Sequence, residues 1–273
     1  MKQAGQQATL ELLGEKESRL APPRRGPAWR PWWAEVAVVG AFDAVYELTS
    51  EALAGSRRVA VANGEAELRF EQDLGLAIEH SVQHAFLSWR WLIEACNDYY
   101  ATVHFAMPIF VLLWLFFRHP ERYRRWRDAL AWTTAIAFVI FVVFPVAPPR
   151  LLPASYGFVD TMARYGGAGR LDSLLLGEAG NQYAAFPSLH LAWAAWCAAA
   201  LSPVLPRRWM KIAVWMDPVI TCFVVVVTAN HYIVDLVAGA VVLGMGCLLA
   251  HRKRPRWNLS WEAWIGPIRQ ERA

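Results

Sequence analysis

Long apolar stretches recur along this chain and constrain its fold more than any other feature. Five are nearly continuous and about as long as a membrane-spanning helix, and they cover residues 100–118, 129–147, 185–203, 212–228 and 231–250. A sixth, over residues 32–53, is interrupted by Glu35, Asp43 and Glu47. Asp43 and Glu47 either face the bundle or form a functional acid pair. Because lipid offers the backbone no hydrogen-bonding partner, the sequence predicts an all-α polytopic membrane bundle of about six transmembrane helices.

Composition agrees with a membrane protein and argues against several other classes. Of 273 residues, 56% are hydrophobic and 18% are charged, against about 25% charged in a soluble domain. This excludes a disordered chain and argues against an ordinary soluble enzyme. The net charge of +4 comes from residues near the ends of apolar stretches, so no nucleic-acid partner is expected. The four cysteines form no C-x-x-C pair, which indicates packing residues rather than a disulfide or zinc framework.

The segments between the apolar stretches define the organisation of the chain. Residues 1–31 are polar, rich in proline and without the apolar core of a signal peptide, which predicts a flexible cytoplasmic tail. Residues 32–251 are predicted to form a single membrane-embedded domain, followed by a second cytoplasmic tail over residues 252–273. Within that domain, residues 57–98 alternate acids with large apolar residues at helical spacing. This pattern indicates extracytoplasmic amphipathic helices on the membrane surface.

Basic residues are concentrated in four segments that alternate with the apolar stretches. These are the N-terminal tail, the loops after the second and fourth predicted spans, and the C-terminal tail. Since cytoplasmic loops carry an excess of Lys and Arg, all four are assigned to the cytoplasm, as six spans require. Residues 145–150, 187–190 and 231–235 then meet at the opposite face. We expect an integral protein of the plasma (inner) membrane with its active site on the extracytoplasmic side.

Two local motifs carry most of the expected chemistry. The segment Phe186 to His190 reads Phe-Pro-Ser-Leu-His, and a proline in the first turn of a helix is favourable because its missing N–H would have no partner there. The start of that helix would direct N–H groups toward an anion such as phosphate. His231 and Asp235 are four residues apart, so a carboxylate could hold the imidazole and raise its basicity. A snorkelling histidine and a structural His–Asp pair are the alternative interpretations.

A third motif ends the third predicted span. Pro145, Pro148 and Pro149 stop the helix and leave Arg150 at the interface. Its guanidinium could clamp a phosphate through two parallel hydrogen bonds. The alternative is an interfacial anchor without a role in chemistry.

Together, P-S-x-H and a later H-x-x-x-D resemble the type 2 phosphatidic acid phosphatase superfamily. Three further segments look similar to its inositol phosphorylceramide synthase (aureobasidin-resistance) branch. They are Ala147–Pro148–Pro149–Arg150, Tyr183 through His190, and Asn97–Asp98–Tyr99–Tyr100 with His104. The resemblance covers roughly residues 70–250. It implies an enzyme of lipid metabolism that transfers or hydrolyses a lipid phosphate at the membrane and needs no cofactor.

The resemblance also implies roles for individual residues. His231 would attack phosphorus and form a phosphohistidine, while Asp235 orients it. His190 would protonate the leaving oxygen and then activate an alcohol or water. Ser188 and Asn230 would bind phosphoryl oxygens. These roles suit phosphoryl transfer, which depends mainly on positioning and charge stabilisation.

The chain departs from the phosphatase pattern at two cationic positions. No Lys lies between Lys16 and Lys211, and Val225 stands where an Arg usually precedes the motif histidine. Arg150 is the best remaining phosphate ligand. Further residues predicted to help or to line the site are Arg164, Arg170, His104 and Tyr183. These departures favour a transferase over a plain phosphatase.

Several other functions account for fewer of these residues. An intramembrane serine protease would pair Ser188 with His231 but leave Asp235 and His190 idle. A haem protein could use His190 and His231 as axial ligands, and a transporter would need no catalytic residues. His80 and His84 have a spacing that can bind zinc, but no third ligand is apparent, so no metal site is expected.

Overall fold

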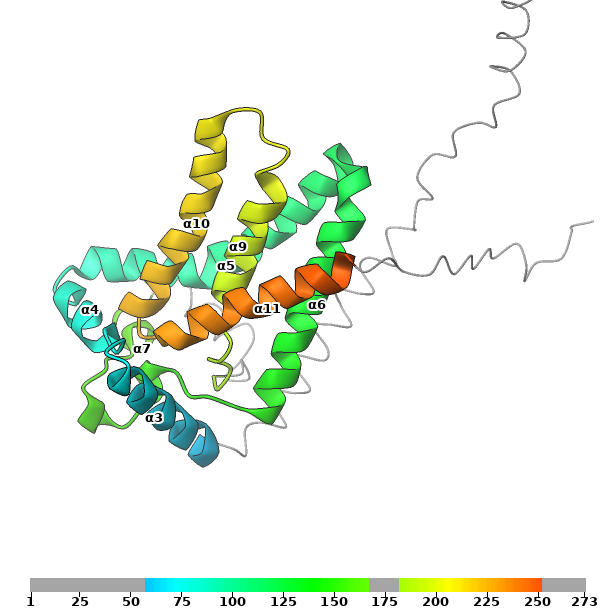
Figure 1. The fold of residues 1–273 in the computed structure, drawn as a ribbon. Coiled ribbons are helices and arrows are strands. Elements are labelled where there is room, and N and C mark those ends of the chain that lie inside the picture. Colours follow the sequence, from blue (N-terminus) through cyan, green and yellow to red (C-terminus); the bar gives the residue numbers. More distant parts are fainter. Residues whose placement is uncertain (1–56, 167–181, 252–273) are drawn as a thin grey trace, which may run out of the picture. The chain divides into compact units, whose positions relative to one another are not determined.

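The computed structural model describes residues 57–166 and 182–251, and these form helices joined by short turns (Figure 1). The helices that follow the first 56 residues are α3 (Arg57–Asp73), α4 (Glu79–Phe86), α5 (Arg90–Arg118), α6 (Pro120–Val143), α7 (Thr161–Tyr165), α9 (Leu189–Leu201), α10 (Arg208–Val227) and α11 (Ile233–His251). Two short 3-10 turns, η2 (Pro149–Leu151) and η3 (Ala154–Tyr156), lie between α6 and α7. In the described part of the chain, β structure is limited to one bridge between Val146 and Ala184. The predicted all-α class is confirmed.

Four helices are long and apolar enough to cross a membrane: α5, α6, α10 and α11. They expose many large apolar side chains, among them Phe117, Val143, Trp209 and Leu248. Water would oppose this exposure, whereas lipid favours it. The chain is therefore an integral membrane protein.

Helix α9 is apolar but has only 13 residues. It contacts α5, α6, α10 and α11, and Ala192, Trp196, Ala198 and Ala200 are fully buried along it. Helix α9 thus packs inside the group of longer helices, which explains why it is apolar around its whole circumference.

The helix boundaries differ most from the predicted spans at the starts of α5 and α6. Helix α5 begins at Arg90 rather than at residue 100, and α6 begins at Pro120 rather than at residue 129. Only His119 separates the two helices. Most arginines of the predicted loop after the second span therefore lie in the first turns of α6. Hydropathy marks the part of a helix that suits lipid, whereas backbone hydrogen bonds continue into its polar ends. The predicted span over 32–53 and both predicted tails lie outside the described residues.

The C-terminal end of α6 and the starts of α9 and α11 are tied together by backbone contacts. Val146 N donates to Tyr183 O at 2.8 Å, and Ser188 N donates to Asp235 O at 3.0 Å. Gly239 packs directly against the backbone of Ser188, where a Cβ atom would clash with the carbonyl oxygen. Helix α3 joins this end because Ala147 N donates to Ala60 O at 3.0 Å. Segments far apart in the sequence therefore meet at the starts of α9 and α11.

Candidate active site

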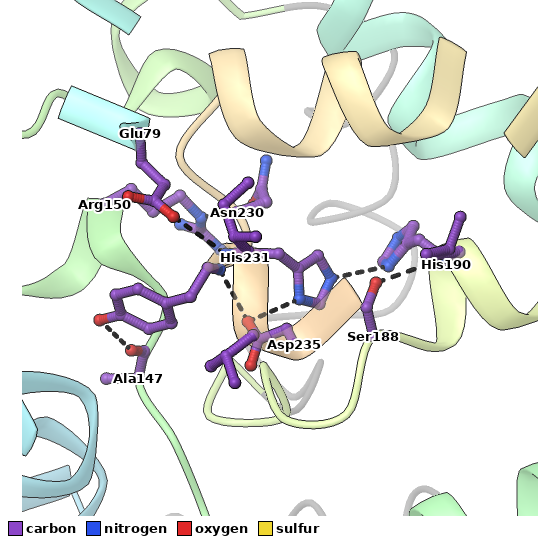
Figure 2. A network of polar contacts seen from close by, with 12 residues as sticks. Glu79, Ala147, Arg150, Ser188, His190, Asn230, His231 and Asp235 are labelled. Atoms are coloured by element: carbon purple, nitrogen blue, oxygen red, sulfur yellow. Dashed lines mark hydrogen bonds and ion pairs between the residues drawn. The ribbon is translucent and has the colours of Figure 1, made fainter. Parts of the chain in front are cut away.

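A chain of three side chains connects the starts of α9 and α11 (Figure 2). His190 Nδ1 lies 3.1 Å from His231 Nε2, and His231 Nδ1 lies 3.1 Å from Asp235 Oδ2. His190 is the second residue of α9, His231 lies in the turn before α11, and Asp235 is the third residue of α11. His231 is 2% exposed and Asp235 is fully buried. The two motifs predicted to converge do meet, and they meet through direct hydrogen bonds.

The contacts of Asp235 indicate which nitrogen donates in each of these hydrogen bonds. Asp235 Oδ2 also accepts from Tyr232 N at 2.8 Å, as an ionised oxygen does, so His231 Nδ1 is the donor to it. The Nε2 atom of His231 then carries a lone pair and accepts from His190 Nδ1–H. This tautomer directs the lone pair of His231 Nε2 toward His190. The arrangement can divide nucleophilic and acid–base duties between two imidazoles.

Aromatic rings fix the plane of His190. The ring centroids of Tyr100 and His104, both on α5, lie 4.1 and 3.8 Å from that of His190 in stacked geometry. His104 also stacks on Trp193 with 4.6 Å between centroids. The residue predicted to line the site, His104, therefore contacts His190 directly. A small cavity between α5, α9 and α10 is lined by His104 and His190.

Arg150 is held on the other side of His231 by three contacts. Its Nε donates to Asn230 Oδ1 at 2.8 Å, its Nη1 pairs with Asp160 Oδ2 at 2.8 Å, and its backbone N donates to Ala229 O at 3.0 Å. Asn230 also donates from its amide nitrogen to Thr228 Oγ1 at 2.7 Å. Asn230, predicted as a phosphate ligand, thus orients Arg150. Asp160 was absent from the sequence prediction because its partnership with Arg150 depends on the turn between them.

Ser188 caps α9 and is completely buried. Its Oγ accepts from Leu191 N at 3.4 Å, and its backbone N–H is used by Asp235 O. Pro187 was predicted within the first helical turn, but α9 begins at Leu189 and Pro187 precedes the cap. The serine takes the position that ends the extended segment because its hydroxyl can accept a helical N–H, which proline cannot do.

The remaining predicted residues make other contacts or lie outside the described part of the chain. Tyr183 supplies a backbone carbonyl to Val146 at the α6–α9 junction. Arg164 is exposed on α7, with its guanidinium 5.4 Å from the centroid of Tyr165. Arg170 lies outside the described residues. His80 and His84 lie on α4 with ring centroids 4.2 Å apart and ring planes tilted by 32°. The described residues contain no group of three or more His, Cys, Asp or Glu side chains placed to hold a metal ion.

Two buried carboxyls at the start of α11 were not predicted. Glu71 Oε1 accepts from Val234 N at 2.7 Å, and Glu79 Oε1 accepts from Ile233 N at 2.9 Å. The first turn of a helix has N–H groups without helical partners, and these two side chains, supplied by α3 and α4, satisfy them. The available signal was weak, because the acids over residues 57–98 alternate with large apolar residues, as on an amphipathic helix at a membrane surface.

Comparisons with known proteins show which family model and which relatives the chain matches. The model of the PAP2 superfamily matches residues 66–249. The inositol phosphorylceramide synthase catalytic subunit aur1 of Schizosaccharomyces pombe is 28% identical over 172 residues, which are 56% of this chain and 39% of that protein. A phosphoinositol dihydroceramide synthase of Bacteroides thetaiotaomicron is 28% identical over 193 residues, 58% of this chain and 58% of that protein. The match thus spans less than two thirds of either relative. No solved structure matches the chain significantly.

Proposed function

This chain belongs to the PAP2 superfamily, and from that premise we propose that it is a membrane phosphotransferase acting on a lipid phosphate through a phosphohistidine on His231. The observation that carries the proposal is the continuous chain His190–His231–Asp235 at the meeting point of α9 and α11. It supplies a nucleophile whose lone pair faces the second histidine, a carboxylate to orient it, and a second imidazole for proton transfer.

In the first step, His231 Nε2 attacks phosphorus and the bond from phosphorus to the leaving lipid oxygen breaks. Doubly protonated His190 gives that oxygen a proton and becomes neutral. The phosphorylated imidazole of His231 carries a positive charge, which Asp235 offsets. Arg150 stabilises the negative charge on the phosphoryl oxygens, because Asn230 and Asp160 hold its guanidinium in place.

In the second step, an acceptor O–H gives its proton to His190 while its oxygen attacks phosphorus. The P–N bond to His231 breaks, and both histidines return to their starting states. An alcohol acceptor gives a transferred phosphodiester, and water gives a free phosphate ester. The same residues therefore support a transferase and a phosphatase, and the acceptor decides between them.

We favour transfer of a phosphoinositol group to a ceramide-class alcohol. The names of the two similar proteins, an inositol phosphorylceramide synthase and a phosphoinositol dihydroceramide synthase, support this acceptor and head group. The absence of Arg at Val225, which is fully buried, also departs from a plain phosphatase. The alternative is a lipid phosphate phosphatase with water as acceptor.

Two other functions fit these contacts less well. Both ring nitrogens of His231 already have partners, in His190 and Asp235, while the Ser188 hydroxyl caps α9. A protease would need Ser188 and His231 bonded to each other. A haem iron bound by His190 and His231 would have to separate two nitrogens that are 3.1 Å apart.

We propose further that the site faces the extracytoplasmic side of the plasma (inner) membrane. His190 lies in the first turn of α9 and contacts His231, whereas Arg207, Arg208 and Lys211 follow the far end of α9. Arg118 and Arg122 flank the α5–α6 junction. Placing these basic segments in the cytoplasm puts His190 and His231 near the opposite face.

The test is product analysis with purified protein in detergent. The protein is incubated with labelled phosphatidylinositol, phosphatidic acid or polyprenyl phosphate, each with and without ceramide or inositol, and products are separated by chromatography. Phosphoinositol transfer to ceramide supports the proposal, and phosphate release without acceptor dependence supports the phosphatase. No conversion of any lipid by the wild type, with the His231→Ala protein as blank, would contradict both.

A further inference from the structure

Four buried carboxyl groups surround the start of α11. Glu67 and Glu71 come from successive turns of α3, Glu79 begins α4, and Asp235 lies in the first turn of α11 itself. Glu71, Glu79 and Asp235 are fully buried, and Glu67 is 9% exposed. Glu79 and Asp235 are shown in Figure 2 with the backbone of this turn. One of these four residues, Asp235, is the partner of His231.

Each of the four carboxyls has one buried oxygen for which the structure shows no hydrogen-bond partner. These atoms are Glu67 Oε2, Glu71 Oε2, Glu79 Oε2 and Asp235 Oδ1. A buried polar atom without a partner is costly, and four adjacent carboxylates would also repel one another. Protons shared between carboxyl groups remove both difficulties. The geometry allows this in two pairs, because Glu67 reaches Asp235 and Glu71 reaches Glu79.

The environment on α3 supports protonated acids at neutral pH. Burial raises the pKa of Glu67 to about 10, with added contributions from the charge and hydrogen bond of Asp235 and the charge of Glu79. Burial likewise raises the pKa of Glu71 to about 9, together with its hydrogen bond to Glu79. Tyr232 and His231, before α11, lie beside these acids, and Arg150 on η2 is paired with Asp160.

We propose that Glu67 is a positioning residue that keeps its proton and donates it in a hydrogen bond to Asp235 Oδ1. This bond leaves Asp235 Oδ2 to accept from His231 Nδ1, so that the lone pair on His231 Nε2 points into the site. The contribution to turnover rests on the proposed function, whereas the proton on Glu67 does not. The Glu71–Glu79 pair holds the same turn through Val234 and Ile233 and stabilises it without contacting a histidine.

The first arm of the test counts protons and needs no activity. In the unfolded chain Glu67 ionises near its ordinary pKa of 4.5, whereas the folded protein holds the proton up to about pH 10. Between these values the folded state binds more protons, so the free energy of unfolding falls as pH rises. We expect Glu67→Gln, which cannot ionise, to reduce that slope by one proton between pH 6 and pH 9, as measured by SDS titration in mixed micelles.

Glu65→Gln is the matched control on the same helix. Glu65 is partly exposed and lies 3.9 Å from Arg69, so its replacement should leave the slope unchanged. A Glu67→Gln slope equal to that of the wild type would mean that Glu67 is ionised in the folded protein, and the proposal would be wrong.

The second arm measures turnover of the lipid substrate that the product analysis identifies. Gln retains an N–H donor for Asp235 Oδ1, whereas Leu has none. We expect Glu67→Leu to lower kcat at least tenfold with KM within twofold, and Glu67→Gln to recover at least a third of wild-type kcat. Equal losses in both variants, or no loss in Glu67→Leu, would contradict the positioning role. If Glu67→Leu does not fold, the Gln variant and the proton count still decide the question.

The two arms separate failure of this inference from failure of the proposed function. If the wild type converts no lipid but Glu67→Gln lowers the proton count, the phosphotransferase proposal is wrong and the carboxyl pair stands. If the wild type is active and the proton count is unchanged by the substitution, the phosphotransferase proposal stands and the carboxyl pair is wrong.

Discussion

His190 Nδ1 and His231 Nε2 are hydrogen-bonded to each other at 3.1 Å in the structure without substrate. The nitrogen proposed as nucleophile is therefore occupied by the proton of its catalytic partner. A phosphoryl group must separate these two atoms before His231 can attack, and the same movement releases His190 to protonate the leaving oxygen. The contact between the two histidines thus determines which of their nitrogens face each other with a proton and a lone pair. The phosphate must then replace one hydrogen bond.

The first prediction assigns the covalent intermediate to His231. We expect His231→Ala to abolish acid-labile, base-stable labelling of the protein by radioactive substrate in a rapid quench. His190→Ala should still form the intermediate from a nitrophenyl phosphodiester, whose leaving group needs no proton, but release it slowly. His84→Ala on α4 serves as control. Labelling that persists without His231 and vanishes without His190 would reverse the two roles.

The second prediction concerns the charge of Asp235. Asp235→Asn keeps the size of the side chain but removes the charge that offsets a phosphorylated imidazole. We expect kcat to fall several hundredfold or more, about 3–5 kcal/mol of transition-state stabilisation by analogy with other His–Asp pairs. Steady-state kinetics with the preferred lipid measures this. Full activity would show that the contact between Asp235 and His231 is structural.

The third prediction concerns the fork of Arg150, which bridges Asn230 and Asp160. Lysine keeps the charge but has a single nitrogen and cannot reproduce this geometry. We expect Arg150→Lys to lower kcat/KM about 10- to 100-fold, or about 1.4–2.8 kcal/mol. Arg69→Lys, in an exposed ion pair on α3, should change kcat/KM less than about twofold. Equal effects of the two substitutions would remove Arg150 from the site.

The fourth prediction compares two glycines of α11. A methyl group on Gly239 would overlap the carbonyl oxygen of Ser188, whereas nothing lies within 4 Å of the same position on Gly244. Gly239→Ala should therefore push the start of α9 away from α11 and destabilise the protein by about 1–3 kcal/mol, with loss of activity. Gly244→Ala should be neutral or stabilising by about 0.5–1 kcal/mol. Melting temperatures and turnover in detergent test both; identical behaviour would contradict the packing argument.

The fifth prediction tests the proposed orientation. In a protein whose native cysteines are replaced, Ser155→Cys in the exposed η3 turn should react with an impermeant maleimide in intact cells. Glu121→Cys, exposed at the opposite α5–α6 junction, should react only after lysis. The reverse pattern would place the histidines on the cytoplasmic side.

Local sequence patterns were enough to predict the chemistry of the site. His231 and Asp235 are four residues apart, and this spacing predicted their contact, although His231 lies in the turn before α11. The meeting of His190 with His231 also followed from sequence, because the positions of the basic segments predicted that residues 187–190 and 231–235 lie at the same face. The all-α class depended on the same apolar stretches, although α5 and α6 extend beyond them at their first turns.

The surroundings of these residues were decided by tertiary structure. Nothing in the spacing of Glu67, Glu71 and Glu79 distinguishes acids that face water from acids that cap a buried turn, because the difference arises only when α3 and α4 pack against the start of α11. The same holds for Arg150, whose partners lie 10 and 80 residues away. A sequence determines contacts within a helix through its periodicity, whereas contacts between helices depend on how whole faces dock. His190, His231 and Asp235 are therefore evident in the sequence, whereas the other groups packed around them are evident only in the fold.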